Sequence, residues 1–225
     1  MTITLFFLQA SRAIRTAWQL EELGLDYEVD FSERVNRVAP PEFKKKAGDL
    51  GKFPTLKDGH VFIYESGAIA EYLEEKYDTG HKLIAKDGEQ RYKALRWVHA
   101  AEATYALHAL PILYVRWFSG DHTDAAKMIE ERMAGNVQKD MELLESELGK
   151  SSGKFLLGDD VSVADCMMHF SATFILEREL GTAGREYPKI KAWLAACEDT
   201  AAYKAAVKKT GYDLSKPGYD VKEGK

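Results

Sequence analysis

The chain has 225 residues, of which 45% are apolar, 11% are aromatic and 30% are charged. This composition is typical of a soluble globular protein and excludes a disordered, collagen-like or coiled-coil chain. The net charge is −5, with 11 basic and 14 acidic residues through residue 82 and 20 basic and 22 acidic residues after it. Neither part has the basic excess of a nucleic-acid-binding protein or of a polybasic membrane anchor.

The first 82 residues alternate between strand-like and helix-like patterns. The continuous β-prone run from Ile3 to Leu8 predicts a strand that is buried on both faces. A helix follows, with Ser11 as its N-cap and Gly24 just after its end, and residues 27–31 predict the next strand. A strand, a helix and a strand within about 30 residues make a βαβ unit.

Four more elements complete this first part. Residues 41–47 predict a short polar helix that opens with two prolines. The dipeptide Asp58-Gly59 predicts a hairpin turn between the two short strands on either side of it. A further helix is expected to begin at Ser66, so the predicted order of elements is βαβ, α, ββα.

From about residue 88 the strand pattern disappears. The periodicity predicts helices over residues 88–118, 123–148, 162–180, 188–197 and 200–209, and a tail over the last 14 residues. Ser162 and Asp165 have the spacing of a capping box at the start of the third of these helices. The predicted fold class is therefore α+β with two domains, a small α/β domain over residues 1–82 and an all-α domain over residues 88–225.

A few residues indicate the cellular compartment and whether the chain has a metal site. The two cysteines, Cys166 and Cys197, form neither a disulfide framework nor a C-x-x-C motif, and the histidines are scattered without metal-ligand spacing. Cys166 follows the capping box on an apolar helix and is expected to be buried. The N-terminal apolar run is too short for a signal peptide, and no apolar run has the length of a membrane span. These features predict a cytoplasmic protein without a metal, a membrane span or a nucleic-acid partner.

Four short motifs follow one another along the chain. They are the pair Ser11-Arg12 after the first strand, the segment Gly51-Lys52-Phe53-Pro54-Thr55-Leu56, the segment Glu65-Ser66-Gly67-Ala68-Ile69, and Ser162-Val163-Ala164-Asp165. In this order and at this spacing they resemble the cytosolic glutathione S-transferase family over nearly the whole chain. Ser11-Arg12, together with residues 39–42, resembles a fungal and bacterial subgroup of that family. The resemblance implies a thioredoxin-like N-terminal domain that binds glutathione and a helical C-terminal domain that shapes the pocket for a second substrate.

Glu65 and Ser66 stand where a strand gives way to a helix. A helix N-terminus carries unpaired N–H groups and the positive end of the helix dipole, which suit a carboxylate. Glu65 adds a negative charge for an ammonium group, so the pair suits a zwitterion such as the γ-glutamyl end of glutathione. From the residues alone, the alternative is a plain N-cap serine beside a surface glutamate.

The segment around Pro54 is expected to bind the rest of the tripeptide. Proline has no N–H group to donate and belongs at the start or edge of a strand. The resemblance implies that the Phe53–Pro54 bond is cis and that the Phe53 backbone pairs with bound glutathione like an added strand. A trans edge proline is the alternative, because most X-Pro bonds are trans. Lys52 and Arg37 are expected to reach the glycine carboxylate of glutathione, although exposed basic residues usually bind nothing specific.

A glutathione transferase must present a thiolate, because the thiolate is the nucleophile. Where the best-known members of the family have a tyrosine, this chain has Phe6, and no cysteine lies near residue 11, which disfavours the thiol-transferase classes. The nearest hydroxyl is that of Ser11, which we expect to donate to the sulfur with help from the Arg12 backbone N–H. Two alternatives stay open. In the first, Ser11 only caps the helix, and the helix dipole and a bound water stabilise the thiolate. In the second, Gln9 is the donor.

The second-substrate pocket is expected in the first helical hairpin. Residues 105–117 are rich in aromatic side chains, and Pro111 predicts a kink or a break there. Tyr105 and His108 lie three residues apart and are expected to share one helix face that lines the pocket. Such an aromatic stripe is also typical of an ordinary core.

The resulting functional hypothesis is a glutathione S-transferase that takes part in detoxification. Its bound thiolate attacks a small hydrophobic electrophile at carbon, or a peroxide at oxygen, and glutathione is a co-substrate. The resemblance also implies a homodimer. The main alternative is a non-catalytic protein of the same fold that acts in regulation or assembly, which Phe6 keeps open because it replaces the usual tyrosine. An isomerase or a reductive dehalogenase on the same scaffold is a third hypothesis, and the absence of a cysteine near the first helix disfavours the dehalogenase.

Overall fold

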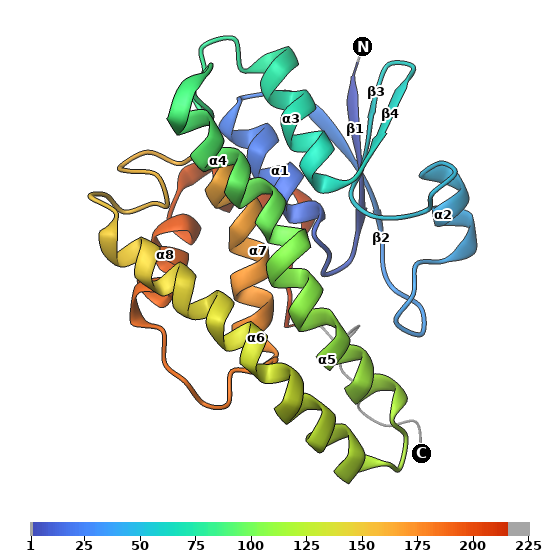
Figure 1. Ribbon diagram of the computed structural model, residues 1–225. Coiled ribbons are helices and arrows are strands. Elements are labelled where there is room, and N and C mark those ends of the chain that lie inside the picture. Colours follow the sequence, from blue (N-terminus) through green and yellow to red (C-terminus); the bar gives the residue numbers. More distant parts are fainter. Residues whose placement is uncertain (1, 216–225) are drawn as a thin grey trace. The chain divides into compact units, whose positions relative to one another are not determined.

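A four-stranded sheet forms the centre of the N-terminal part of the chain in the computed structural model, which describes residues 2–215 (Figure 1). The strands are β1 (Ile3–Leu8), β2 (Tyr27–Ser32), β3 (Thr55–Asp58) and β4 (Val61–Tyr64). They lie in the order β2-β1-β3-β4, with β1 and β2 parallel and the other two pairs antiparallel. The carboxyl ends of β1, β2 and β4 therefore meet the amino end of β3 at one edge of the sheet.

The predicted order of elements in this part is confirmed. Its helices are α1 (Ala13–Glu22), α2 (Pro41–Lys46), α3 (Ser66–Tyr77) and α9 (Ala201–Thr210). Gly24 follows α1 with φ +64°, and the N–H groups of Gly24 and Leu25 return to the last turn of the helix, as expected for a glycine that ends a helix. Strand β1 is buried on both faces, and Phe6 packs with Phe43 of α2 in an aromatic cluster. Phe6 is thus a core residue of the sheet face that α2 covers.

The helical part of the chain follows, and its residues 86–198, all of which the structure describes, contain no strand. Its elements are α4 (Gly88–Ala100), a π-helical turn (Ala101–Ala106), α5 (Leu107–Phe118), α6 (Thr123–Lys150), α7 (Val163–Glu177) and α8 (Pro188–Glu198). Of the kink or break predicted at Pro111, the break does not occur: α5 continues through Pro111, and Ala109 and Ile112 on either side of it are buried in the core. Cys166 lies in the buried part of α7, as predicted.

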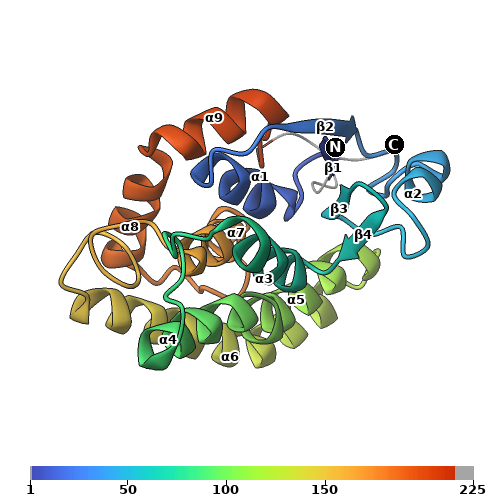
Figure 2. The same ribbon diagram turned by 90° about the horizontal axis from the view of Figure 1, so that it is seen from above.

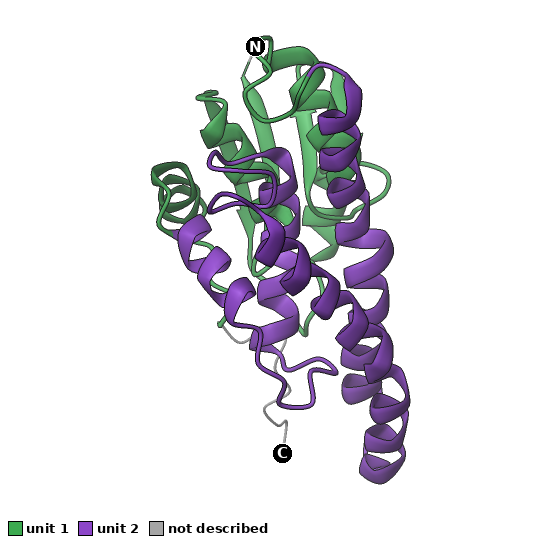
Figure 3. Ribbon diagram, turned by 60° about the vertical axis from the view of Figure 1, so that its left-hand side comes forward, with its two compact units in different colours: residues 1–85, 199–225 green, residues 86–198 purple. Residues whose placement is uncertain are grey.

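The last helix belongs with the sheet. The chain divides into one unit of residues 1–85 with 199–225 and a second unit of residues 86–198 (Figure 3). The sequence places everything after residue 88 in the helical domain, whereas the structure groups α9 with the N-terminal part. The difference arises because α9 lies along α1, where Tyr203 meets the Trp18 ring edge-to-face at 5.2 Å (Figure 2).

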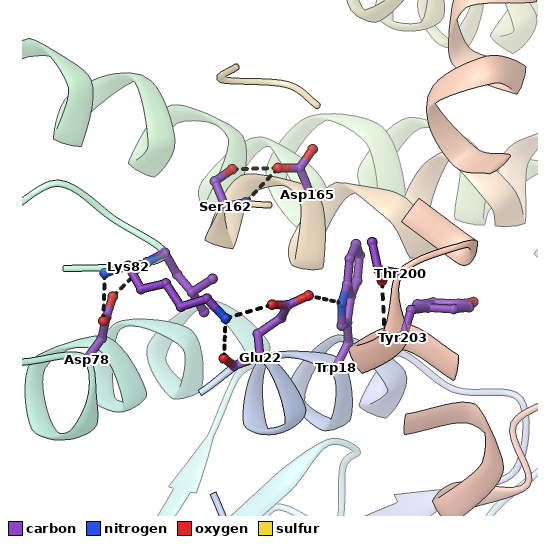
Figure 4. Close-up of polar contacts among 9 residues, drawn as sticks. Trp18, Glu22, Asp78, Lys82, Ser162, Asp165, Thr200 and Tyr203 are labelled. Atoms are coloured by element: carbon purple, nitrogen blue, oxygen red, sulfur yellow. Dashed lines mark hydrogen bonds and ion pairs between the residues drawn. The ribbon is translucent and has the colours of Figure 1, made fainter. Parts of the chain in front are cut away.

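Two further sets of contacts stabilise the unit that contains the sheet. The Trp18 indole N–H donates to Glu22, whose carboxylate and carbonyl also accept from the Lys82 ammonium group (Figure 4). Beyond α9, Tyr212 and Leu214 are buried, so the start of the predicted tail is part of the core. Residues 216–225 of that tail lie outside the described part of the chain.

Asp58 holds the end of β3 at the other edge of the sheet. One of its carboxylate oxygens accepts from the Lys76 ammonium at 2.6 Å, the Tyr72 hydroxyl at 2.7 Å and the Tyr77 hydroxyl at 2.5 Å. Burial pushes the pKa of Asp58 upward, but these three hydrogen bonds outweigh burial and lower the pKa to about 2. The ionised carboxylate therefore stabilises the folded chain.

Asp58→Asn is expected to lower the free energy of unfolding at neutral pH by about 1–2 kcal/mol. The folded pKa lies below the unfolded value of about 3.9, so this stabilisation is complete above that pH and is lost as the pH falls towards 2. Urea denaturation of both proteins at neutral pH and near pH 3 measures the two differences. A difference between the two proteins that does not shrink in acid would contradict the role of the ionised carboxylate.

Candidate functional site

The sheet brings three of the predicted motifs to one edge. The start of β3 pairs with β1 on one side and with the end of β4 on the other. Ser11 follows β1, Pro54 directly precedes β3, and Glu65 directly follows β4. The register of the sheet therefore gathers the segments that the resemblance assigns to glutathione, although Ser11 and Glu65 lie 54 positions apart in the sequence.

Ser11 lies one residue before the N-cap of α1. The helix begins at Ala13 with Arg12 as its N-cap, so the prediction of Ser11 as the N-cap is wrong by one position. The Ser11 side chain is 3% exposed, and its hydroxyl oxygen accepts the Ala13 N–H at 3.3 Å. A hydroxyl has one hydrogen to donate besides its two lone pairs, and within residues 2–215 no acceptor takes this hydrogen. Holding the helix start and donating to a ligand are therefore compatible roles.

The start of α3 is arranged differently from the plain N-cap serine of the alternative interpretation. Glu65 is the N-cap with φ +66° and Ser66 is the first helical residue, and within residues 2–215 no side chain makes a capping hydrogen bond at this helix start. The Ser66 hydroxyl accepts instead from the Arg15 guanidinium at 3.1 Å, and Arg15 is 1% exposed. A buried positive charge thus stands beside an uncapped helix N-terminus, and both attract a carboxylate.

Two residues of α1 that the sequence analysis missed connect this helix to α3. Arg15 reaches Ser66, and one turn later the Gln19 side-chain amide donates to the Ala70 carbonyl at 3.0 Å and to the Glu74 carboxylate at 2.7 Å. Arg15 and Gln19 are four residues apart, and both are buried among apolar neighbours. Polar side chains on the buried face of a helix are the signal that would have identified them.

The segment before β3 is fixed on several sides. The Phe53–Pro54 bond is cis, as the resemblance implies. The Phe53 ring stacks on Phe43 of α2 with centroids 4.8 Å apart and an interplanar angle of 4°. The Lys52 carbonyl accepts from the Thr55 hydroxyl at 2.7 Å, while the Lys52 side chain is exposed. The backbone that is expected to pair with glutathione is thereby held at the edge of the sheet.

Arg37 lies in the loop between β2 and α2. It has φ +69° in a tight turn that Val35 and Val38 close with two backbone hydrogen bonds. The Arg37 carbonyl accepts from the Arg34 guanidinium at 3.0 Å, and the Arg37 side chain is half-buried. Gln9, the alternative thiol donor, has its side-chain oxygen held by the Arg34 backbone N–H at 3.0 Å.

In the helical unit, Tyr105 and His108 both point to Asp140 of α6. The Tyr105 hydroxyl donates to the Asp140 carbonyl at 2.8 Å, and the His108 ring nitrogen Nδ1 lies 2.6 Å from the Asp140 carboxylate. Tyr105 is 1% exposed, and burial raises the pKa of its hydroxyl. Its ring packs in the core, and a role for Tyr105 in the second-substrate pocket stays a prediction. His108 is partly exposed and stays a prediction.

The predicted capping box is confirmed in the same unit. The Ser162 N–H and hydroxyl both donate to Asp165, at 2.9 Å and 2.6 Å (Figure 4). Among residues 2–215 no helix is long and apolar enough to cross a membrane. In the same range, no group of three or more His, Cys, Asp or Glu side chains is placed to hold a metal ion.

Two family models and a known relative match this chain. The model of the glutathione S-transferase N-terminal domain matches residues 1–75, and that of the C-terminal domain matches residues 105–200. A glutathione S-transferase-like protein of Beauveria bassiana is 31% identical over 84% of this chain and 87% of its own length.

Solved structures agree with this assignment. A glutathione S-transferase from Actinobacillus pleuropneumoniae has a TM-score of 0.80 and 27% identity, covering 97% of this chain and 99% of its own. A glutathione transferase homolog from Lodderomyces elongisporus, with two GSH per subunit, has the same fold at a TM-score of 0.73 and 21% identity, covering 92% of this chain and 98% of its own. The chain belongs to the glutathione S-transferase family.

Proposed function

We propose that this chain is an active glutathione S-transferase, in which Ser11 activates the glutathione thiol for attack on small hydrophobic electrophiles. The observation that carries the proposal is the buried Ser11 hydroxyl at the start of α1. It stands at the same sheet edge as the cis Phe53–Pro54 bond and the uncapped start of α3. The structural homolog that contains GSH supports glutathione as the co-substrate.

Each end of glutathione has a complementary group at this edge. The γ-glutamyl carboxylate binds at the start of α3, where the helix N–H groups and the Arg15 charge attract it. The Glu65 carboxylate binds the neighbouring ammonium group. The Phe53 backbone pairs with the peptide part, and Lys52 and Arg37 bind the glycine carboxylate.

Ser11 then lowers the pKa of the bound thiol. Its hydroxyl donates to the sulfur, and the Arg12 backbone N–H and the positive end of the α1 dipole favour the same negative charge. A hydrogen bond to a charged group contributes about 1.5–3 kcal/mol, which corresponds to about one to two pH units in the thiol pKa. The thiol proton leaves to solvent, the thiolate attacks the electrophilic carbon, and the leaving group departs with its bonding electron pair.

The proposal also assigns one residue of the helical unit to the second substrate. His108 is partly exposed beside Asp140 and is the residue we propose to contact the electrophile. A homodimer is part of the same proposal, since the family resemblance implies it.

Glu65→Gln is expected to weaken glutathione binding about 10-fold or more, because it removes the charge that binds the ligand ammonium. Glu75→Gln on the same helix is the matched control, since Glu75 is exposed and carries the same charge. Isothermal titration calorimetry with glutathione measures both affinities. Equal affinities of the two variants would show that Glu65 does not bind the ammonium group.

The proposed activity is tested by mixing the purified chain with glutathione and a chlorodinitrobenzene, with a hydroperoxide in a parallel assay. Turnover above the uncatalysed rate is expected with the aromatic electrophile. If glutathione binds but neither reagent turns over at any pH between 6 and 9, the non-catalytic alternative holds and the proposal fails.

A further inference from the structure

Arg34 lies just after β2, at the sheet edge where we propose that glutathione binds. It makes hydrogen bonds to two separate segments there. Its backbone N–H donates to the Gln9 side-chain oxygen, its Nε donates to the Gln9 carbonyl, and its Nη1 donates to the Arg37 carbonyl, each at 3.0 Å. The Gln9 N–H in turn donates to the Ser32 carbonyl at 2.8 Å. Gln9 is therefore held through its N–H, its carbonyl and its side chain by residues 32–34.

The turn that follows Gln9 needs such support. Ala10 has φ +48°, a left-handed conformation that is unfavourable for a residue with a Cβ atom. Residues persist in this region when the surrounding structure over-determines them. Ser11 comes directly after this turn, so the position of its hydroxyl depends on the Ala10 backbone and on the anchor at Gln9.

The second part that Arg34 holds is the tight turn of residues 35–38. Asn36 and Arg37 both have positive φ, at 50° and 69°, so the two central residues of this turn are left-handed as well. The Nη1 bond of Arg34 goes to the Arg37 carbonyl. One planar guanidinium thus connects the segment before Ser11 with the turn that carries Arg37. The point charge of a lysine cannot bond both carbonyls in this fork geometry.

We infer that Arg34 is a positioning residue that holds the Ser11 hydroxyl in line with the glutathione sulfur. The inference rests on the proposed function and deepens it, because it names the group that keeps the thiol-activating segment in place. Arg34 acts through Gln9 and touches neither substrate. A displacement of about 1 Å at a reacting group is enough to lower a rate about 100-fold, so loss of this anchor has a measurable effect.

The test compares the pH profile of kcat at saturating glutathione in the wild type, Arg34→Met and Arg34→Lys. The acid limb of this profile reports the thiol pKa in the bound complex. For Arg34→Met we expect kcat at neutral pH to fall about 10-fold and the acid limb to move upward by about one pH unit. Arg34→Lys keeps the positive charge but loses the planar guanidinium that donates to both the Gln9 and the Arg37 carbonyls. It is expected to show the same direction of change.

Asp58→Asn is the matched control for a general loss of stability. It destabilises the same unit at the opposite edge of the sheet, away from Gln9 and Ser11. Its pH profile is expected to coincide with that of the wild type. If Arg34→Met does not fold, Arg34→Lys decides, because it keeps the positive charge and the backbone N–H bond to Gln9 and loses only the planar guanidinium.

The outcomes separate the two proposals. An acid limb of Arg34→Lys that coincides with the wild type, or a shift that Asp58→Asn reproduces, overturns the positioning role of Arg34 and leaves the proposed function intact. A wild type without any turnover overturns the proposed function and the role of Arg34 with it. An upward shift in the Arg34 variants that Asp58→Asn does not reproduce supports the inference.

Discussion

Ser11→Ala is expected to lower kcat for glutathione conjugation at neutral pH by about 10- to 100-fold. The variant loses the hydrogen bond to the sulfur, which contributes about 1.5–3 kcal/mol, and about 1.4 kcal/mol corresponds to a factor of ten in rate. The pKa of the bound thiol should rise by one to two pH units for the same reason. The measurements are kcat against pH and the ultraviolet absorbance of the thiolate during a pH titration of the glutathione complex.

Ser32→Ala provides the control for this variant. Ser32 lies at the same sheet edge, at the end of β2, and its hydroxyl donates to the Glu33 carbonyl at 3.0 Å. Its kinetics should match those of the wild type. Because Ser11→Ala also removes the bond from the Ala13 N–H, circular dichroism at rising temperature must show that α1 is still formed. A folded Ser11→Ala protein with the rate and pH profile of the wild type would leave Ser11 with a structural role only.

Asp165→Ala is expected to have the largest effect on stability, lowering the free energy of unfolding by about 3–5 kcal/mol. The Asp165 carboxylate is completely buried and accepts four hydrogen bonds. One oxygen accepts from the Leu156 N–H at 2.9 Å and the Trp193 indole at 2.8 Å, and the other from the N–H and hydroxyl of Ser162. Alanine removes the carboxylate that accepts from these four buried donors, and a buried donor that loses its partner costs about 1–3 kcal/mol.

Asp165→Asn separates the two halves of this network. Its carbonyl can still accept from Leu156 and Trp193, while its amide meets the Ser162 donors, so a loss smaller than that of alanine is expected. Asp160→Ala, an exposed aspartate in the preceding loop, should change stability by less than about 0.5 kcal/mol. Urea denaturation measures all three. A loss below about 1 kcal/mol for Asp165→Ala would contradict the view that Asp165 holds the loop, α7 and α8 together.

Elements whose signals are local were predictable from the sequence. The apolar run of β1, Gly24 after α1 and the Ser162–Asp165 box each specify their own structure within a few residues. The sequence predicts Ser11 as the N-cap of α1, whereas Arg12 holds that position. The Ser11 hydroxyl accepts from the N–H of Ala13, the first helical residue, although Ser11 lies one position before the N-cap. Element boundaries of this kind depend on a single φ/ψ pair, which sequence patterns do not resolve.

Features that depend on distant partners were not predictable. The docking of α9 on α1 requires the contact of Trp18 with Tyr203, and the uncapped start of α3 requires Arg15 from another helix. An aromatic stripe has the same spacing whether it lines a pocket or packs in a core, so the sequence alone does not show that the Tyr105 ring is buried. Only the position of Asp140 across the helix pair shows that its hydroxyl is used internally.

The position of the glutathione sulfur relative to Ser11 tests the central claim most directly. A crystal structure of the chain with bound glutathione measures the distance from the sulfur to the Ser11 hydroxyl oxygen. The account predicts a distance of about 3–3.5 Å, within hydrogen-bond range, with the γ-glutamyl carboxylate at the start of α3. A sulfur that lies beyond hydrogen-bond range of Ser11, with Gln9 or a water as its donor, would contradict it.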